Sequence, residues 1–417
     1  MVCTGQNAQG KSVRAVLRAV TSRINRDAPV YTAQHVTMIT YGMKSMSSSS
    51  GEVRHLLLAL KPLIMHSSEY ESESLLNHQF ASAMFGLQGM SSDEFSVRAY
   101  LQALLSRISD GSEKSCREFS GQELGMACHG MRSMNNRWTI VRECLNVINS
   151  RVEVSLKHRI VMDPGEISMA LHGMQGMKCS AHRAHTSNLN IKKSYNLSDV
   201  GLGGFNVVEG LGIVSTQPVW VVENEDENWV PVATDVPHEE EHLVDTVQFS
   251  RCSGDASNES GSLKRLLCYL GKIIAYRKES LSLNQIGLAL YGLRGMSANC
   301  SEAVEVESII EFLTEDLEAT LLGNNLCVSD CRSIASAFFG LQKMSSEGVV
   351  VRCMLRQLGI YLEKLLSING QTVGNILFGM QCMSSSTPEV REILNHLSEK
   401  IGKIFVFAHC VSFLLSD

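Results

Sequence analysis

The sequence predicts an all-α protein, an α-solenoid of about seven helix-pair repeats of roughly 39–48 residues. Three observations carry this prediction. A 12-residue segment such as QFASAMFGLQGM (79–90) recurs seven times, its apolar residues follow the period of a helix, and a second helical pattern follows most copies at a fixed distance. Self-similarity with a period of about 20–50 residues is typical of stacked helical pairs.

Every copy of this segment carries an aromatic residue or His, then Gly, then Met or Leu, two variable residues and a Met that never changes. The glycines stand 44, 44, 43, 119, 48 and 39 residues apart, so a single spacing departs from the period. These glycines are Gly42, Gly86, Gly130, Gly173, Gly292, Gly340 and Gly379. We number each copy from its glycine, with negative positions before it and positive positions after it.

Apolar residues dominate positions −6, −3, −2, +1 and +4, which fall on one side of a helix at about 100° per residue. A Gly inside a helix costs about 1 kcal/mol relative to Ala, and seven such glycines indicate a close backbone approach between stacked helices. First helices are therefore expected over 33–46, 77–90, 121–134, 165–177, 283–296, 331–344 and 370–383.

A second helix is expected to open near Val53, Val97, Val141, Leu263, Val306, Val351 and Val390. Ser and Asn residues fill the links before it, as at Ser91 and Ser92, and we expect them to act as N-caps because their oxygens accept free helix-start N–H groups. A basic residue follows in most copies, and we expect it to form hydrogen bonds between repeats rather than to contact phosphate. These residues are Arg54, Arg98, Arg142, Lys264, Arg352 and Arg391.

The chain divides into five parts. Residues 1–30 are either the second helix of a partial repeat or an amphipathic, Arg-rich targeting segment; the first of these would make the chain begin inside a repeat. Repeats occupy 31–178 and 262–403, and an acidic insertion at 179–261 separates the two helices of copy four. Ser, Asn and Gly are frequent in this insertion, which predicts a largely disordered loop. An apolar tail, 404–417, is either the start of another helix or a product of truncation.

The composition of the chain favours an intracellular protein without a membrane span. The chain has 417 residues, and its 13 cysteines include no CxxC pair, which favours reduced, mostly buried thiols inside the cell. No run of 18 apolar residues occurs, so no membrane span is expected. Residues 179–257 hold 4 Lys and Arg against 12 Asp and Glu, a net charge of −8; the whole chain carries −6, so the remainder carries +2.

Several motifs resemble catalytic or cofactor sites but lack the required context. Residues 5–12 spell the phosphate-loop pattern GxxxxGKS, yet only four residues precede them, too few for the buried strand that delivers such a loop. An HExxH motif at 238–242 follows Pro237 within a polar stretch, a GLGG run stands at 201–204, and Cys179, His182 and His185 lack an evident fourth ligand. We therefore predict no enzyme activity, no cofactor and no metal.

The candidate site consists of residues repeated on the first helices. Position −1 holds a ring in every copy, namely Tyr41, Phe85, His129, His172, Tyr291, Phe339 and Phe378. Position +2 holds a long hydrogen-bond donor, namely Lys44, Gln88, Arg132, Gln175, Arg294, Gln342 and Gln381. Position −8 is often polar, and −8, −5, −1 and +2 lie within about 80° on the helix, away from the apolar side.

A flat ring beside a donor is the chemistry with which single-stranded RNA is read, because rings stack on bases and donors meet base edges or phosphates. The alternative is that the −1 rings fill the contact between neighbouring first helices while the +2 residues are solvated. A continuous positive strip along this face would favour RNA, and a patchy or negative one would favour a protein partner.

The first helix of copy five shows a recognisable order, Ile286, Ala289, Leu290, Tyr291, Gly292, Leu293 and Met296. This order resembles the octotricopeptide and heptatricopeptide repeats over roughly 31–178 and 262–402. Those families are helical-pair arrays that bind RNA in mitochondria and plastids and that sometimes end in a RAP domain. The resemblance implies single-stranded RNA binding in an organelle. The alternative function is a protein–protein interaction scaffold that binds a protein or peptide in the groove of the solenoid. The alternative location is the cytoplasm.

Overall fold

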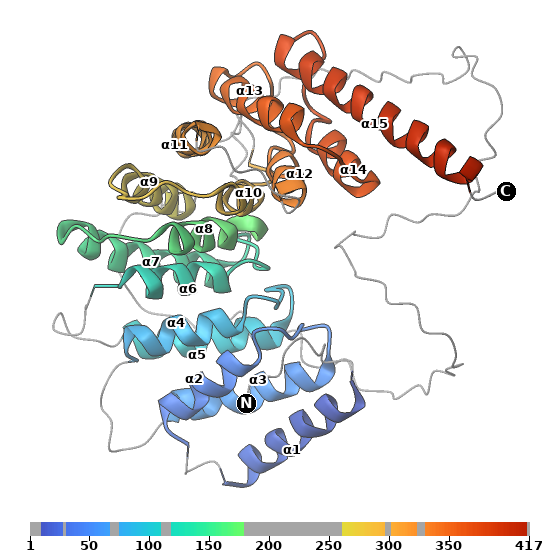
Figure 1. The fold of residues 1–417 in the computed structure, drawn as a ribbon. Helices are drawn as coiled ribbons and strands as arrows, with labels where there is room; N and C mark the ends of the chain where they lie inside the picture. Colours follow the sequence, from blue (N-terminus) through green and yellow to red (C-terminus); the bar gives the residue numbers. More distant parts are fainter. Residues whose placement is uncertain are drawn as a thin grey trace, which may run out of the picture. The chain divides into compact units, whose positions relative to one another are not determined.

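A computed structural model describes residues 10–27, 31–66, 75–109, 118–178, 261–296, 302–322 and 330–414 of the chain. Within these ranges every regular element is a helix, which confirms the all-α class (Figure 1). Residues 179–260 of the acidic insertion, with the motifs from Cys179 through the HExxH residues, lie outside the described residues, as do residues 5–9 of the phosphate-loop pattern.

The first helices of the seven copies form one layer, in which each helix contacts the next along the chain. This first layer consists of α2 (Ala33–Gly42), α4 (Asn77–Gly86), α6 (Gly121–Gly130), α8 (Pro164–His172), α10 (Leu283–Gly292), α12 (Asp330–Gly340) and α14 (Gly370–Gly379). The contact between α8 and α10 bridges the 119-residue glycine spacing, so the succession continues across the insertion.

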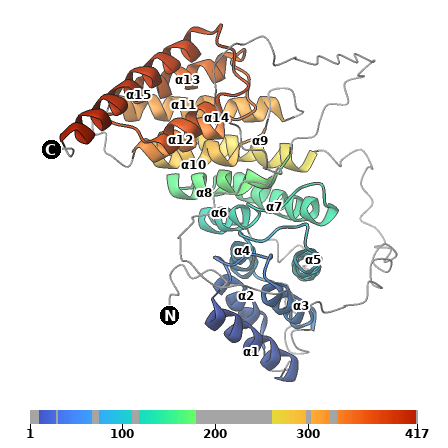
Figure 2. The same cartoon turned by 90° about the vertical axis from the view of Figure 1, so that its right-hand side faces the viewer.

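The remaining α-helices form a second layer beside it, and again each contacts the next (Figure 2). This layer consists of α1 (Lys11–Asp27), α3 (Gly51–His66), α5 (Phe95–Ser109), α7 (Thr139–Lys157), α9 (Gly261–Ala275), α11 (Ala303–Leu322), α13 (Val349–Lys364) and α15 (Pro388–Leu414). Helix α1 packs on α3, where the second helix of a preceding repeat would pack. Helix α15 runs to Leu414, so residues 404–414 extend the last second helix instead of beginning another.

The predicted apolar side forms the core between the layers. In copy two the residues at −6, −3, −2, +1 and +4 are Phe80, Ala83, Met84, Leu87 and Met90, and each has 0% of its side chain exposed. The helical period of the sequence therefore identified the buried side of the first helices correctly.

The predicted ends of the first helices were wrong by about four residues. Helix α6 ends at Gly130 and not at Met134, and η3 (Gly173–Gly176) takes the corresponding place after α8. After the glycine the backbone tightens, so that the Met131 N–H donates to the Cys128 oxygen (3.0 Å) and the Met134 N–H to the Met131 oxygen (2.9 Å). These bonds span three residues, and a short 3₁₀-type turn keeps the +4 Met buried without continuing the α-helix.

The glycines bring neighbouring first helices into backbone contact, as the sequence predicted. A Cβ placed on Gly130 would collide with the carbonyl of Met84, which is position −2 of the preceding copy. The same carbonyl position faces the glycine of each of the other later copies and of copy two, whereas Gly42 has no atom within 4 Å of its Cβ position, since α2 has no preceding first helix among the described residues. Only glycine fits at six of the seven positions.

The second helices open two or three residues before the predicted positions, at Gly51 in α3 and Phe95 in α5, for example. The link residues do not cap them. The Ser92 hydroxyl instead accepts the backbone N–H of Asn135 in the next copy (2.8 Å), and the Ser48 hydroxyl accepts that of Ser91 (2.9 Å). Their oxygens hold neighbouring repeats together, so the predicted N-caps were wrong.

The recurring basic residue of the second helix donates its hydrogen bonds within its own repeat, contrary to the prediction of hydrogen bonds between repeats, although Arg54 and Lys264 also form ion pairs with Glu94 and Glu305 of the next repeat. The Arg98 guanidinium donates to the carbonyls of Ser92 (2.9 Å) and Asp93 (2.7 Å), and Arg142 repeats the pattern on Asn136 (3.1 Å) and Arg137 (2.8 Å). A guanidinium offers five donors, and these Arg residues use them to bind carbonyls of the link that precedes their own helix.

Candidate nucleic-acid interface

The seven rings at position −1 contact one another in one continuous ladder. The centroids of successive rings lie 5.6, 5.5, 5.2, 5.7, 5.5 and 5.3 Å apart, from Tyr41 to Phe378. This ring ladder is Tyr41, Phe85, His129, His172, Tyr291, Phe339 and Phe378. It arises because the glycine beside each ring brings the helix ends close together.

Each inner ring of the ladder is covered on both sides by the neighbouring rings. A base inserted between two rings needs a centroid separation of roughly 7 Å, twice the ~3.4 Å rise of a nucleic-acid strand, and the observed spacings are shorter. The rings therefore fill the contact between neighbouring first helices, the alternative that the sequence left open. Tyr41 and Phe378, at the two ends, are 38% and 45% exposed and keep the most accessible rings.

The donors at position +2 lie along the same edge. The Lys44 Nζ stands 4.9 Å from the Tyr41 centroid, and the Arg294 guanidinium lies over Tyr291 (5.0 Å) and Phe339 (4.9 Å). Cations over ring faces are attracted by the ring quadrupole. We call this set the donor row, namely Lys44, Gln88, Arg132, Gln175, Arg294, Gln342 and Gln381.

Two glutamines of the donor row bind neighbouring copies. The Gln88 amide donates to the Lys44 carbonyl (2.6 Å), and the Gln175 amide donates to the Tyr291 hydroxyl (3.4 Å). Gln381, in the last copy, is exposed. The polar residues at −8 form a separate exposed row near the other end of the first helices, namely Gln34, His78, Gln122, Asn284, Arg332 and Gln371.

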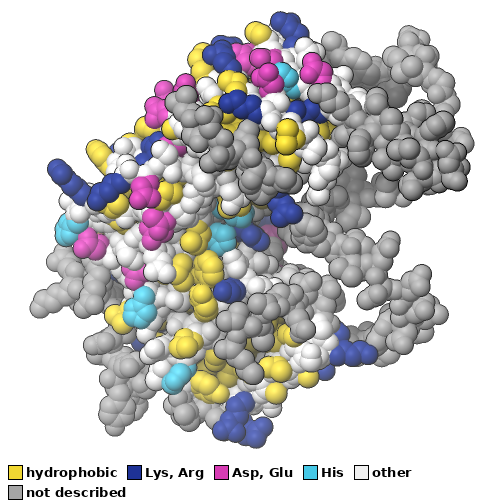
Figure 3. All heavy atoms as spheres, in the orientation of Figure 1, with side chains coloured by type: hydrophobic (Ala, Val, Ile, Leu, Met, Phe, Trp, Pro, Cys, Tyr) yellow, Lys and Arg dark blue, Asp and Glu magenta, His cyan; other side chains and the backbone are white. Residues whose placement is uncertain are grey.

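The edge that carries the donor row has cations and no acids. Positions +1 to +4 contain no Asp or Glu in any copy, and no ion pair to Lys44, Arg132 or Arg294 is found among the described residues. Helix α11 of the second layer, by contrast, carries six acidic residues and no basic ones. The cations alternate with neutral glutamines, and Figure 3 likewise shows Lys and Arg side chains as separate patches on the visible face.

Sequence analysis missed Lys343, which belongs to the same edge. It is exposed, has a φ of 71° and follows Gln342 at position +3. The signal was available, since it is the one basic residue at +3 among the seven copies.

The middle of the ladder holds two histidines with lowered pKa values. Burial lowers the pKa of His129 to about 4 and that of His172 to about 3, and the nearby charge of Arg132 adds to both shifts. Burial also lowers the pKa of the Arg132 guanidinium. Both rings are therefore neutral at pH 7, and Arg132 supplies the positive charge.

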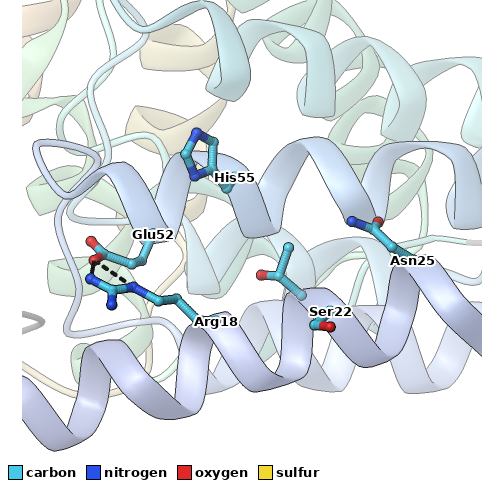
Figure 4. Close-up of a pocket in the computed structure, with 6 residues that line it drawn as sticks. Arg18, Ser22, Asn25, Glu52 and His55 are labelled. Atoms are coloured by element: carbon cyan, nitrogen blue, oxygen red, sulfur yellow. Dashed lines mark hydrogen bonds and ion pairs between the residues drawn. The ribbon is translucent and has the colours of Figure 1, made fainter. Parts of the chain in front are cut away.

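A polar groove lies away from this edge, between α1 and α3 of the second layer (Figure 4). Arg18, Ser22, Asn25, Glu52 and His55 line a volume of about 320 Å³. Arg18 donates to Glu52 (2.7 Å), which with a backbone hydrogen bond lowers the pKa of that carboxyl to about 2. The groove's one acid is thus neutralised within the chain.

The described residues contain no group of three His, Cys, Asp or Glu side chains placed to hold a metal ion. In the same part of the chain, no helix combines the length and apolar character needed to cross a bilayer. Comparison of the sequence with protein-family models and curated proteins, and of the structure with solved structures, found no match.

Proposed function

We propose that the helical array is an α-solenoid of about seven repeats, of the octotricopeptide and heptatricopeptide type, that binds single-stranded RNA along the edge formed by the ring ladder and the donor row. One observation carries the proposal. Lys44, Arg132 and Arg294 recur at position +2, on an edge without acids, where the ladder sets their spacing. Such a row suits a polyanion that also offers hydrogen-bond acceptors.

The role of the rings changes within this proposal. Stacking on bases between inner rungs is not available at the observed ring spacing, so the end rings and the ring edges are the surfaces left for bases. All fourteen predicted residues of the ladder and the donor row remain RNA-binding candidates. By its resemblance, the protein would act in a mitochondrion or plastid.

The test compares two triple variants of equal charge. Lys44→Gln, Arg132→Gln and Arg294→Gln together should weaken binding of a mixed single-stranded RNA pool by tenfold or more at low salt. Lys61→Gln, Lys272→Gln and Lys364→Gln remove three charges from the second layer and should change the affinity less than about threefold. The difference should shrink as salt rises, because phosphate contacts act through counterion release.

A protein–protein scaffold is the second candidate, and two observations favour it. The inner ring faces are closed, and the cations alternate with neutral residues instead of forming a continuous strip. Absence of measurable RNA binding by the wild-type protein at low salt would select the scaffold over RNA.

A further inference from the structure

The ring ladder changes its geometry at His172. Four of the six neighbouring pairs are stacked, with interplanar angles of 18–29°, whereas His172 makes angles of 74° with His129 and 82° with Tyr291. The ladder therefore consists of two stacks of three rings with His172 turned on edge between them. No hydrogen bond to the His172 ring is found among the described residues.

Polar side chains from three consecutive copies converge at this break. Arg132 comes from the turn after α6, Gln175 from η3, and Tyr291 from α10. The Gln175 amide donates to the Tyr291 hydroxyl (3.4 Å), the His172 and Tyr291 rings meet edge-on with their centroids 5.7 Å apart, and the charge of Arg132 acts on the His172 ring. No other rung brings a guanidinium, an amide, a hydroxyl and an imidazole together.

The charge at this point is unbalanced within the described residues. Arg132 is half-buried and has no carboxylate partner there, and a partly buried charge without a counter-ion costs free energy. The surrounding groups are donors or neutral rings. An anion that accepts several hydrogen bonds would satisfy them together, and a phosphate group has this character.

We propose that Arg132, His172, Gln175 and Tyr291 form a phosphate-binding subsite in the middle of the ring ladder, which takes one phosphate group of a bound single-stranded RNA. The inference rests on the proposed function for the source of the phosphate. The closed ring faces on both sides favour a phosphate over a base at this point. The subsite would fix the register of the strand on the array, because the other cations lie over stacked rings.

Inorganic phosphate and an RNA pool test the subsite separately. With 50 mM phosphate, against chloride of equal ionic strength, the wild-type Tm should rise by about 2–4 °C more than that of Arg132→Gln. Lys272→Gln, which removes one positive charge from the second layer, should keep the wild-type response. Tyr291→Phe is the second variant, since Phe stands at this position in other copies and preserves the ring; its phosphate response should also fall.

The RNA arm uses the same proteins at low salt. Arg132→Gln should raise the dissociation constant tenfold or more, whereas Lys272→Gln should change it less than about threefold. A phosphate response in Arg132→Gln and Tyr291→Phe equal to that of the wild type overturns the subsite, whatever RNA does. A response lost in both variants, together with no RNA binding by the wild type, retains the subsite, overturns the RNA proposal and points to a phosphorylated protein.

Discussion

The two helix layers are held together by different means. In the first layer, the glycine of each helix after α2 lies against a carbonyl of the preceding helix, and the rings touch along the same edge. In the second layer, helices meet through side chains, with a buried core of Leu and Ile and ion pairs such as Arg277 with Asp316. Backbone contact leaves no room for variation, whereas side-chain contact can adapt. The first layer therefore carries the regular register that a repeated binding surface requires.

The largest expected effect comes from the glycines of the first layer. Gly130→Ala places a Cβ against the Met84 carbonyl, and a backbone atom cannot move aside as a side chain does. We expect a loss of about 3 kcal/mol or more in the free energy of unfolding, measured by denaturant unfolding. Gly42→Ala is the matched control, because its Cβ meets no atom within 4 Å, and it should leave stability unchanged or raise it by up to about 1 kcal/mol through helix propensity. Equal effects at both positions would break the contrast between backbone and side-chain packing.

The ring ladder should show the next largest effect, graded by position. Phe339 stacks on rings at both sides, whereas Phe378 stacks on one side and is 45% exposed. Phe339→Ala should therefore cost about 2 kcal/mol and Phe378→Ala about half as much, since each stacked pair contributes beyond its buried area. Thermal unfolding of the two variants would measure the difference. A larger loss at Phe378 would show that the ladder does not stabilise the layer.

The two histidines of the ring ladder should make the thermal stability of the protein depend on pH, through groups in the first layer alone. The folded-state pKa values of about 4 and about 3 lie below the ordinary value near 6.5, so the unfolded state binds more protons as pH falls through 6.5. Their contribution to stability is complete above pH 6.5 and is lost progressively below it. The wild-type Tm should fall by a few degrees more between pH 7.5 and pH 5 than that of His129→Phe with His172→Phe. Parallel pH curves for the two proteins would contradict the neutral state of these rings.

A smaller effect is expected from the hydrogen bonds that join the links of neighbouring repeats. Ser92→Ala leaves the Asn135 N–H without the acceptor that it has at 2.8 Å, and this should cost about 1 kcal/mol. Ser49→Ala removes an exposed hydroxyl whose hydrogen bond stays within its own link, and it should be nearly neutral. Denaturant unfolding measures the free energy of unfolding of both variants. An unchanged value for Ser92→Ala would show that the hydrogen bond between links does not stabilise the array.

The sequence predicted most of the fold because the repeat period, the apolar side and the glycines are local features repeated many times. It misplaced the helix ends by about four residues, since the +4 Met is buried equally by a helix and by the tighter turn at Met131–Met134. The roles of Ser92 and Arg98 were predicted wrongly, because the same side chain can cap a helix, bind its own link or bind the next repeat. Only the hydrogen-bond partner seen in the structure distinguishes these roles.

The candidate site was predicted residue by residue, but its geometry was not. A recurring ring at −1 fits both an open stacking plane and a closed ladder, and the choice depends on the distance between helices that the glycines set. The edge-on contact between His172 and Tyr291 joins residues 119 positions apart in the chain, beyond any local pattern.

In the proposed function, the ligand binds to the first layer, at the edge of the ring ladder and the donor row. Hydrogen exchange of the full chain, measured with and without a saturating single-stranded RNA pool, shows which layer the ligand protects. We expect added protection in the turns at 41–46, 129–134 and 291–296, with no change in second-layer helices such as α7 and α13. Protection in the second layer, with exchange of those turns unaltered, would contradict it.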